Sequence, residues 1–282
     1  MAQVAHELIE PTAARGALTF IVPQDDKPAF HSAALTGGDP KVLFETEERT
    51  VDIADMRQLS QAPSIDREGF ELIKHKTSVS DLYDDDAVTG PYYKEVEELL
   101  RDRFGASKVI IFDATRRSDG GSGAANPDGL RGPARRVHVD YTAASGPQRV
   151  KDLLGEDEGN TLLASDAQII QVNVWRPIRG PVKRAPLALA DASSVAADEL
   201  VATDQVFPDR VGEIYHLAHA PTQKWYFAPD MDVDEVLIIK GWDSLDDGRA
   251  KYTPHGAFDL PETDASTPPR ESIEIRTLVI VE

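Results

Sequence analysis

The chain contains no cysteine among its 282 residues, which excludes disulfides, thiolate metal sites and a cysteine nucleophile together. It also lacks any apolar run of membrane-spanning length. Its opening residues, MAQVAHELIEPTAARG, lack the basic and apolar segments of a signal peptide. The sequence therefore predicts a cytoplasmic protein that does not associate with a membrane.

Basic residues are scarce, because 30 lysines and arginines stand against 49 aspartates and glutamates and the formal net charge is −19. A nucleic-acid-binding protein needs a basic track for phosphates, so nucleic acid is not an expected partner. The only local basic clusters are the arginine pairs 116–117 and 135–136, which are too short to follow a nucleic-acid backbone. They flank a glycine-rich loop, where their alternative role is to clamp one carboxylate of a small-molecule substrate.

What is present suits a loop-rich β protein with a real core, since 41% of the residues are apolar. We expect a single domain in three parts: an N-terminal arm (1–60), a scaffold that ends in the glycine-rich loop 119–134 (61–134), and a strand-rich core (135–282). Predicted strands follow one another at roughly ten-residue spacing after residue 135, which indicates a sandwich or barrel. The expected fold class is α+β, mainly β, with helical and irregular elements towards the N-terminus.

The clearest predicted helix is GPYYKEVEELLRDRFG (90–105), with Pro91 in its first turn, Val96 and Leu100 at helical spacing, and Gly105 as its stop. Two shorter helices are expected at 146–155 and 193–202. Strands are expected at 18–22, 41–46, 66–79, 108–118, 167–178, 212–221, 224–231, 234–244 and 271–282, and around RRVHVDYT.

That last stretch places His138 and Asp140 two residues apart on a predicted strand, so both side chains point to one face. They can therefore reach one metal ion; the alternative is a salt-bridged surface pair. A third ligand is available in His255 of KYTPHGAFDLP, and a set of two histidines and one carboxylate suits non-haem Fe(II). The alternative candidates for metal ligands are His216 and His219, but their i, i+3 spacing in a strand puts them on opposite faces.

The closing strand, PRESIEIRTLVIV, places Arg270, Ser272, Glu274 and Arg276 on one face. Six residues span about 20 Å of strand, so two arginines can approach opposite ends of a short dicarboxylate. The alternative is that Glu274 pairs with one of them and that both are structural.

A second polar face is expected on QVNVWRPI, where Gln171, Asn173 and Trp175 alternate with apolar residues. Asn173 is a candidate to orient a co-substrate, and Trp175 to wall a substrate pocket or simply to pack. Arg176 is a candidate contact for an acidic substrate or a surface ion pair. Tyr141, next to the HxD strand, either points to the site or packs.

The order of these motifs resembles the Fe(II)/2-oxoglutarate-dependent oxygenase superfamily, whose core is a double-stranded β-helix, or jelly roll. A closer resemblance is to the hydroxylase/desaturase family of secondary metabolism, of the cephamycin 7α-methoxylation and aspergillic-acid-pathway type. It rests on DREGFELIKHKTSVSD, RVHVDYT, VNVWRPI, PLALADASSV, KWYFAPDMDVDEVLIIKGWDS, PHGAF and PRESIEIRTLV.

The resemblance implies that His138, Asp140 and His255 bind Fe(II). It implies that Arg270, with Ser272, holds the distal carboxylate of 2-oxoglutarate, while Arg276 lies near the C1 end. O₂ would complete the reaction, and a ferryl species would hydroxylate, desaturate or cyclise a small secondary metabolite. The alternatives are a non-haem iron oxidase that uses no 2-oxoglutarate, and a catalytically inactive jelly-roll binding protein. A homodimer is left open.

Overall fold

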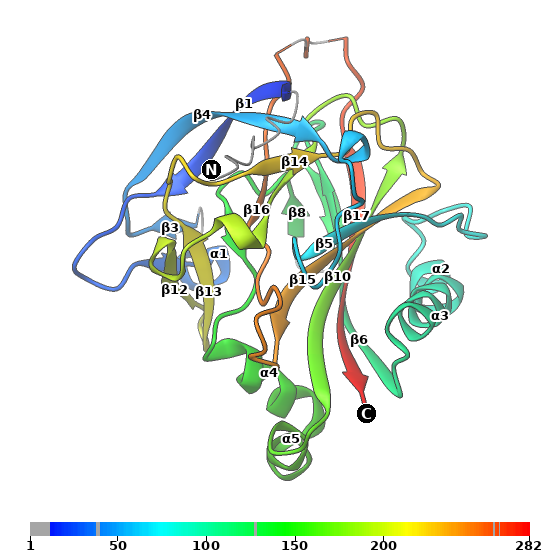
Figure 1. The fold of residues 1–282 in the computed structure, drawn as a ribbon. Coiled ribbons are helices and arrows are strands. Elements are labelled where there is room, and N and C mark those ends of the chain that lie inside the picture. The colour runs from blue at the N-terminus through cyan, green and yellow to red at the C-terminus, as the bar shows by residue number, and fades with distance from the viewer. Residues whose placement is uncertain (1–11, 38–39, 127–128, 262, 265) are drawn as a thin grey trace, which may run out of the picture.

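The computed structural model describes residues 12–37, 40–126, 129–261, 263–264 and 266–282. The first part of the predicted N-terminal arm, and residues 127–128 of the glycine-rich loop, therefore lie outside the described residues. The described chain is mainly β, with two large curled sheets and a few helices (Figure 1). This agrees with the mainly β class expected from the sequence.

One large sheet gathers ten described strands from both halves of the chain. In spatial order they are β1 (Thr12–Ile21), β4 (Thr46–Asp55), β14 (Trp225–Phe227), β11 (Leu187–Ala190), β16 (His255–Ala257), β9 (His138–Val139), β13 (Val211–Leu217), β12 (Leu200–Val206), β2 (Ala29–His31) and β3 (Lys41–Val42). The N-terminal arm is thus built into this sheet, because β4 pairs in parallel with β14 and β1 pairs with β4.

The other large sheet has five strands, in the order β5 (Phe70–Lys74), β15 (Glu235–Asp243), β10 (Gln168–Arg179), β17 (Glu271–Val281) and β6 (Lys108–Ser118). Each strand in it is antiparallel to its neighbours. The glycine-rich loop contains a small ribbon of β7 (Ala124–Asn126) and β8 (Gly129–Arg131), which packs against β6.

The described helices are few and cover the edges and the outside of the sheets. They are α1 (Ala33–Thr36), α2 (Asp85–Ala87), α3 (Tyr93–Phe104), α4 (Ser145–Leu154) and α5 (Glu156–Leu163), with 3₁₀ turns at Met56–Gln58, Ala192–Ser194 and Ala197–Glu199 and a π turn at Val88–Tyr92. Helix α3 ends where the sequence predicts, since Gly105 adopts φ 63° in the left-handed region that glycine favours. None of the described helices is long and apolar enough to cross a membrane.

One predicted helix is wrong. Residues 193–202 form two short 3₁₀ turns and then enter β12, which begins at Leu200. Asp191 accepts a hydrogen bond from Ser193 N and so starts the first turn, while Leu200 onwards pairs with β13. Cross-strand pairing therefore outweighs the helical propensity of the alanines.

Strands β10 and β17 separate an apolar outer face from a mixed inner face. Their odd–even alternation sends one set of side chains outwards, where α3 covers them with Val96 and Leu100. This outer set includes Ile170, Val172, Val174, Ile273, Ile275 and Val279. The alternate residues point towards the ten-stranded sheet, as the sequence predicts for Asn173 and Trp175.

The inner face is apolar at its two ends and polar in the middle. At one end Trp175 packs with Leu237 of the same sheet and Leu189 of the other. At the opposite end Ile169 and Leu278 pack with Trp242 beside α4. Between them lie the buried Asn173 and Glu274 and the partly buried Arg276, together with the histidines of β9 and β16, which makes this polar centre the candidate site.

The end nearest α4 is tightly packed at Gly146. A Cβ added there would lie 2.6 Å from the ring of Trp242, closer than real Cβ contacts allow. We expect Gly146→Ala to lower the free energy of unfolding by about 1–3 kcal/mol through overpacking, measured by urea denaturation. The matched control is Gly90→Ala, where a Cβ meets nothing within 4 Å; equal losses in the two variants would contradict this reading.

Candidate active site

His138 and His255 lie opposite each other on the paired strands β9 and β16, and their ring centroids are 4.6 Å apart. Nδ1 of His138 is 2.9 Å from Arg136 O, and Nδ1 of His255 is 2.9 Å from Thr253 O. A carbonyl oxygen can only accept, so each Nδ1 carries the proton and donates. An imidazole that is neutral and protonated on Nδ1 has its lone pair on Nε2, which is the form that binds a metal.

Asp140 lies beside these rings, with its Oδ1 3.7 Å from His138 Nε2. Its other oxygen accepts a hydrogen bond from Asn173 Nδ2 at 2.5 Å and lies 3.6 Å from Arg276 Nε. Burial opposes ionisation of this carboxyl, but the positive charge of Arg276 and the Asn173 bond outweigh it and hold its pKa below the usual range. Burial, and then the neighbouring His255, lowers the pKa of His138 to about 3. The neighbours are therefore a neutral imidazole and an ionised carboxylate.

Among the described residues, no three His, Cys, Asp or Glu side chains are grouped closely enough to enclose a metal ion as they stand. The fit of the predicted trio therefore rests on its chemistry and proximity. Two imidazole nitrogens and one carboxylate form a borderline-to-hard donor set that suits Fe(II), and the same faces offer no thiolate. His138 lies close to both Asp140 and His255, and the sequence prediction that the three hold one metal ion stays a prediction.

The rival histidines have other partners. His216 lies opposite His138 on β13, but its Nδ1 is 3.0 Å from Thr203 Oγ1 and its ring packs on Phe44. His219 stacks edge-on against Phe20, with centroids 5.1 Å apart. The two histidines thus do not point to one place, as their spacing predicts.

Arg276 is surrounded by carboxylates. Its guanidinium nitrogens lie 2.9 Å from Asp113 Oδ2, 2.7 Å from Glu274 Oε1 and 3.6 Å from Asp140 Oδ2. These three contacts tie β6, β17 and the residue after β9 to one cation. The alternative that Glu274 pairs with one arginine is thus correct for Arg276.

Arg270 has the opposite surroundings. It is only 2% exposed, its Nη1 donates to Ala185 O at 2.8 Å, and its guanidinium lies 5.8 Å from the Trp175 ring centroid. Its Nε has no hydrogen-bond partner, and none of the described carboxylates forms an ion pair with it. Burial, and then the neighbouring Arg117, lowers its pKa to about 9. A buried cation with spare donors is thus available to an anion.

The remaining predicted residues divide between the site and the packing around it. Ser272 is buried on β17 opposite Arg117, two residues from Arg270 and on the same face. Tyr141 packs in the apolar end with Trp242 and Leu278, and burial raises the pKa of its phenol to about 12. Trp175 packs in the other end under Arg270.

Arg176 does not reach the site. It points to the outer face of β10, where its guanidinium contacts Tyr92 Oη at 3.0 Å, Val233 O at 2.5 Å and His75 Nδ1 at 2.6 Å. There it lines a cleft of about 370 Å³ with Arg179, on the side of the sheet away from His138. The expectation that Arg176 contacts the substrate is corrected, because its neighbour Trp175 takes the inner face and successive residues of a strand alternate.

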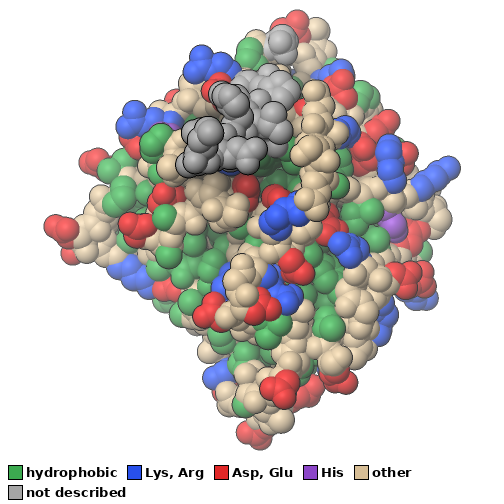
Figure 2. All heavy atoms as spheres, viewed as in Figure 1, with side chains coloured by type: hydrophobic (Ala, Val, Ile, Leu, Met, Phe, Trp, Pro, Cys, Tyr) green, Lys and Arg blue, Asp and Glu red, His purple; other side chains and the backbone are tan. Residues whose placement is uncertain are grey.

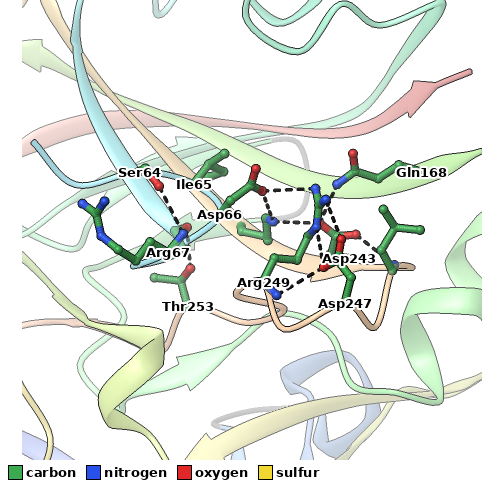
Figure 3. Close-up of polar contacts among 12 residues, drawn as sticks. Ser64, Ile65, Asp66, Arg67, Gln168, Asp243, Asp247, Arg249 and Thr253 are labelled. Atoms are coloured by element: carbon green, nitrogen blue, oxygen red, sulfur yellow. Dashed lines mark hydrogen bonds and ion pairs between the residues drawn. The ribbon is translucent and has the colours of Figure 1, made fainter.

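The sequence reasoning missed a polar network next to His255, and Figure 3 shows its Asp66, Asp243 and Thr253. Lys240, fully buried, lies 2.7 Å from the buried Asp243 and 3.1 Å from Asp66. The Lys240 carbonyl accepts from Thr253 N, and the Thr253 hydroxyl donates to Gly69 O at 2.6 Å. Because Thr253 O is the partner of His255 Nδ1, the network fixes the ring of a candidate ligand. In the sequence, the only indication of this network is the spacing of Lys240 and Asp243 within KGWDS.

The hydroxyl bond of Thr253 can be tested with a nearly isosteric change. We expect Thr253→Val to lower the free energy of unfolding by about 0.5–1.5 kcal/mol, because Gly69 O loses the Thr253 hydroxyl as a donor and keeps Lys240 N. Thr263→Val is the matched control, since the Thr263 hydroxyl is buried with no hydrogen-bond partner in the described chain. Denaturant titration of both variants measures the difference; a control that is destabilised as much would refute the assignment.

Comparisons with known proteins place the chain in a family. Residues 18–280 match the family model described as "Oxidoreductase/YMDC permease-like domain". The hydroxylase/desaturase CTB9 of Cercospora beticola is 36% identical over 84% of this chain and 78% of its own length. The hydroxylase/desaturase efuI of Hormonema carpetanum is 31% identical over 88% of both chains. The Fe(II)/2-oxoglutarate-dependent dioxygenase nvfI of Aspergillus novofumigatus is 30% identical over 86% of this chain and 87% of its own.

Comparison with solved structures leads to the same family. The iron and alpha-ketoglutarate-dependent endoperoxidase NvfI superposes with a TM-score of 0.82 at 27% identity, over 95% of this chain and 97% of that one. A structure of the same enzyme in a different conformation also gives a TM-score of 0.82, at 28% identity. The resemblance drawn from the ordered motifs is confirmed: the chain belongs to the hydroxylase/desaturase family of Fe(II)/2-oxoglutarate-dependent dioxygenases.

Proposed function

We propose that the two curled sheets form a double-stranded β-helix and that His138, Asp140 and His255 hold Fe(II) in its polar centre. The observation that carries this proposal is the pair of imidazoles on neighbouring strands, each with Nδ1 bound to a carbonyl, beside an ionised carboxylate. When bound, Fe(II) and 2-oxoglutarate supply the oxidation of a substrate C–H bond by O₂, with release of succinate and CO₂.

The surrounding residues prepare these ligands. Arg136 O and Thr253 O hold the two rings by their Nδ1–H groups, so both Nε2 atoms are available without a change of tautomer. Asn173 and Arg276 favour the ionised form of Asp140. Arg276 is therefore a positioning residue in this proposal, and not the anchor of the co-substrate.

Arg270 is the proposed anchor of the distal carboxylate of 2-oxoglutarate. Arg276 of β17 and Arg270, which directly precedes β17, differ in their ion pairs: Arg276 contacts three carboxylates, whereas Arg270 forms no ion pair with any of those described. A buried guanidinium without an anion is costly, and a bidentate carboxylate relieves that cost. Ser272, buried on the same face, is placed to add a hydroxyl donor.

The metal assignment makes a direct prediction. His255→Ala should lose the capacity to bind one equivalent of Fe(II), because only one imidazole and one carboxylate remain. His216→Ala is the control, since His216 neighbours His138 but bonds to Thr203. Metal content after anaerobic reconstitution and desalting is the measurement. Stoichiometric iron in His255→Ala, with loss in His216→Ala, would transfer the site to His216.

The assignment of Arg270 to the co-substrate makes a further prediction. Arg270→Ala should weaken 2-oxoglutarate binding at least tenfold, since removing one partner of a buried charged pair costs about 2–5 kcal/mol. Arg276→Ala should act chiefly on metal retention through Asp140. Calorimetric titration of the anaerobic Fe(II)-loaded variants separates the two effects. A larger loss of 2-oxoglutarate affinity in Arg276→Ala would exchange their roles, and no loss in either would remove the co-substrate assignment.

The proposed substrate is a small molecule. On the face shown in Figure 2, lysine and arginine side chains are scattered among aspartates and glutamates and form no continuous basic track. The walls of the inner face are partly aromatic, through Trp175 and Tyr226. The names of the relatives include hydroxylation, desaturation and endoperoxide formation, so the outcome on this chain's substrate depends on which C–H bond is held beside the ligands.

A further inference from the structure

Arg117 is a cation of the inner face that the proposed mechanism does not use. It lies on β6 opposite Ser272 of β17, and therefore shares the inner face with Glu274 and Arg276. Its neighbour Arg116 points the other way, where it donates to Leu82 O and forms an ion pair with Asp85. The arginine pair expected to act together is thus split between the two faces of the sheet.

The carboxylates around Arg117 are already committed to other groups. Glu274 lies 2.7 Å from Arg276, Asp140 accepts from Asn173, and Asp113 lies 2.9 Å from Arg276. The hydrogen bond that Arg117 makes runs from Nη1 to Gly132 O at 3.0 Å, and no ion pair joins it to any carboxylate within the described ranges. Partial burial lowers the pKa of Arg117.

Two guanidiniums of the polar centre have no ion pair among the described residues. Asp113, Glu274 and Asp140 lie 2.9, 2.7 and 3.6 Å from Arg276, and none of them forms an ion pair with Arg117 or Arg270. In the proposed function the distal carboxylate of 2-oxoglutarate binds Arg270. Arg117 therefore still lacks an anion in the loaded site.

Access distinguishes Arg117 from the anchor. Arg270 is 2% exposed, whereas Arg117 is only partly buried and donates to Gly132 O, just after the β7–β8 ribbon. Once 2-oxoglutarate occupies Arg270 in the proposed function, Arg117 is the guanidinium that a later molecule can reach. The position of Arg117 thus suits the last component to bind.

We propose that Arg117 binds an anionic group, a carboxylate, on the substrate, and so selects acidic small molecules with an apolar body. The proposal rests on the function proposed above, because it takes the neighbouring Arg270 for the co-substrate. The carboxylate of 2-oxoglutarate itself is the other source of the same chemistry, and the experiment separates the two.

The probes are octanoate and its uncharged counterpart octanamide, together with 2-oxoglutarate. Each is titrated calorimetrically into anaerobic Fe(II)-loaded protein, the first two at saturating 2-oxoglutarate. The unaltered protein should bind octanoate at least tenfold more tightly than octanamide, and Arg117→Gln should lose that preference while its 2-oxoglutarate affinity changes less than threefold. Arg135→Gln is the matched control, because Arg135 pairs with Asp259 on the surface and should leave the preference intact.

Three results overturn the proposal: no preference in the unaltered protein, an equal preference in Arg117→Gln, or a loss in Arg117→Gln of 2-oxoglutarate affinity as large as that in Arg270→Ala. The last result would assign Arg117 to the co-substrate. Failure of the unaltered protein to bind 2-oxoglutarate at all would instead contradict the proposed function, so the two failures are distinguishable.

Discussion

The ion pairs of Arg276 are the contacts on which the polar centre depends. One guanidinium joins Asp113 of β6, Glu274 of its own strand and Asp140 after β9, so it links the two sheets at the point where their apolar packing is interrupted. Its positive charge also offsets the burial of Asp140. Without it, a carboxylate enclosed among side chains would favour its neutral form, which is a weaker metal ligand. The ion pairs of Arg276 therefore both link the two sheets and keep Asp140 in its ionised form.

Much of the site could be predicted from the alternation of strand residues. His138 and Asp140, Asn173 and Trp175, and the even-numbered residues of β17 each lie on one face, because side chains two apart on a strand point the same way. The same rule shows why the expectation for Arg176 was wrong, since the face of Trp175 excludes its neighbour. Alternation does not say which face is inside when both carry apolar residues.

The parts of the site that could not be predicted depend on contacts between segments that are distant in the sequence. The sequence does not reveal that Arg276 contacts three carboxylates while Arg270 pairs with none of the described ones, because Asp113 lies far from β17 along the chain. The support of His255 by Lys240 and Gly69 likewise requires three segments to meet. The helix expected at 193–202 failed for a related reason, since Leu200 is drawn into β12 by pairing with β13, which follows it. Local propensity is a weak guide where the partner strand decides.

The place of the N-terminal strands sets the order in which the chain can be completed. Strand β4 pairs in parallel with β14, and Leu18, Phe20 and Ile53 pack with Trp225 and Phe227 from the last quarter of the sequence. Strands β1 and β4 can pair with each other early, but the other edge of β4 has no partner until β14 has been synthesised. Closing so long a loop carries a large entropic cost and is typically slow, and until then an apolar edge of the growing sheet stays uncovered. Synthesis of this protein therefore includes an interval in which the nascent chain is most prone to aggregation, and that interval ends only when β14 emerges.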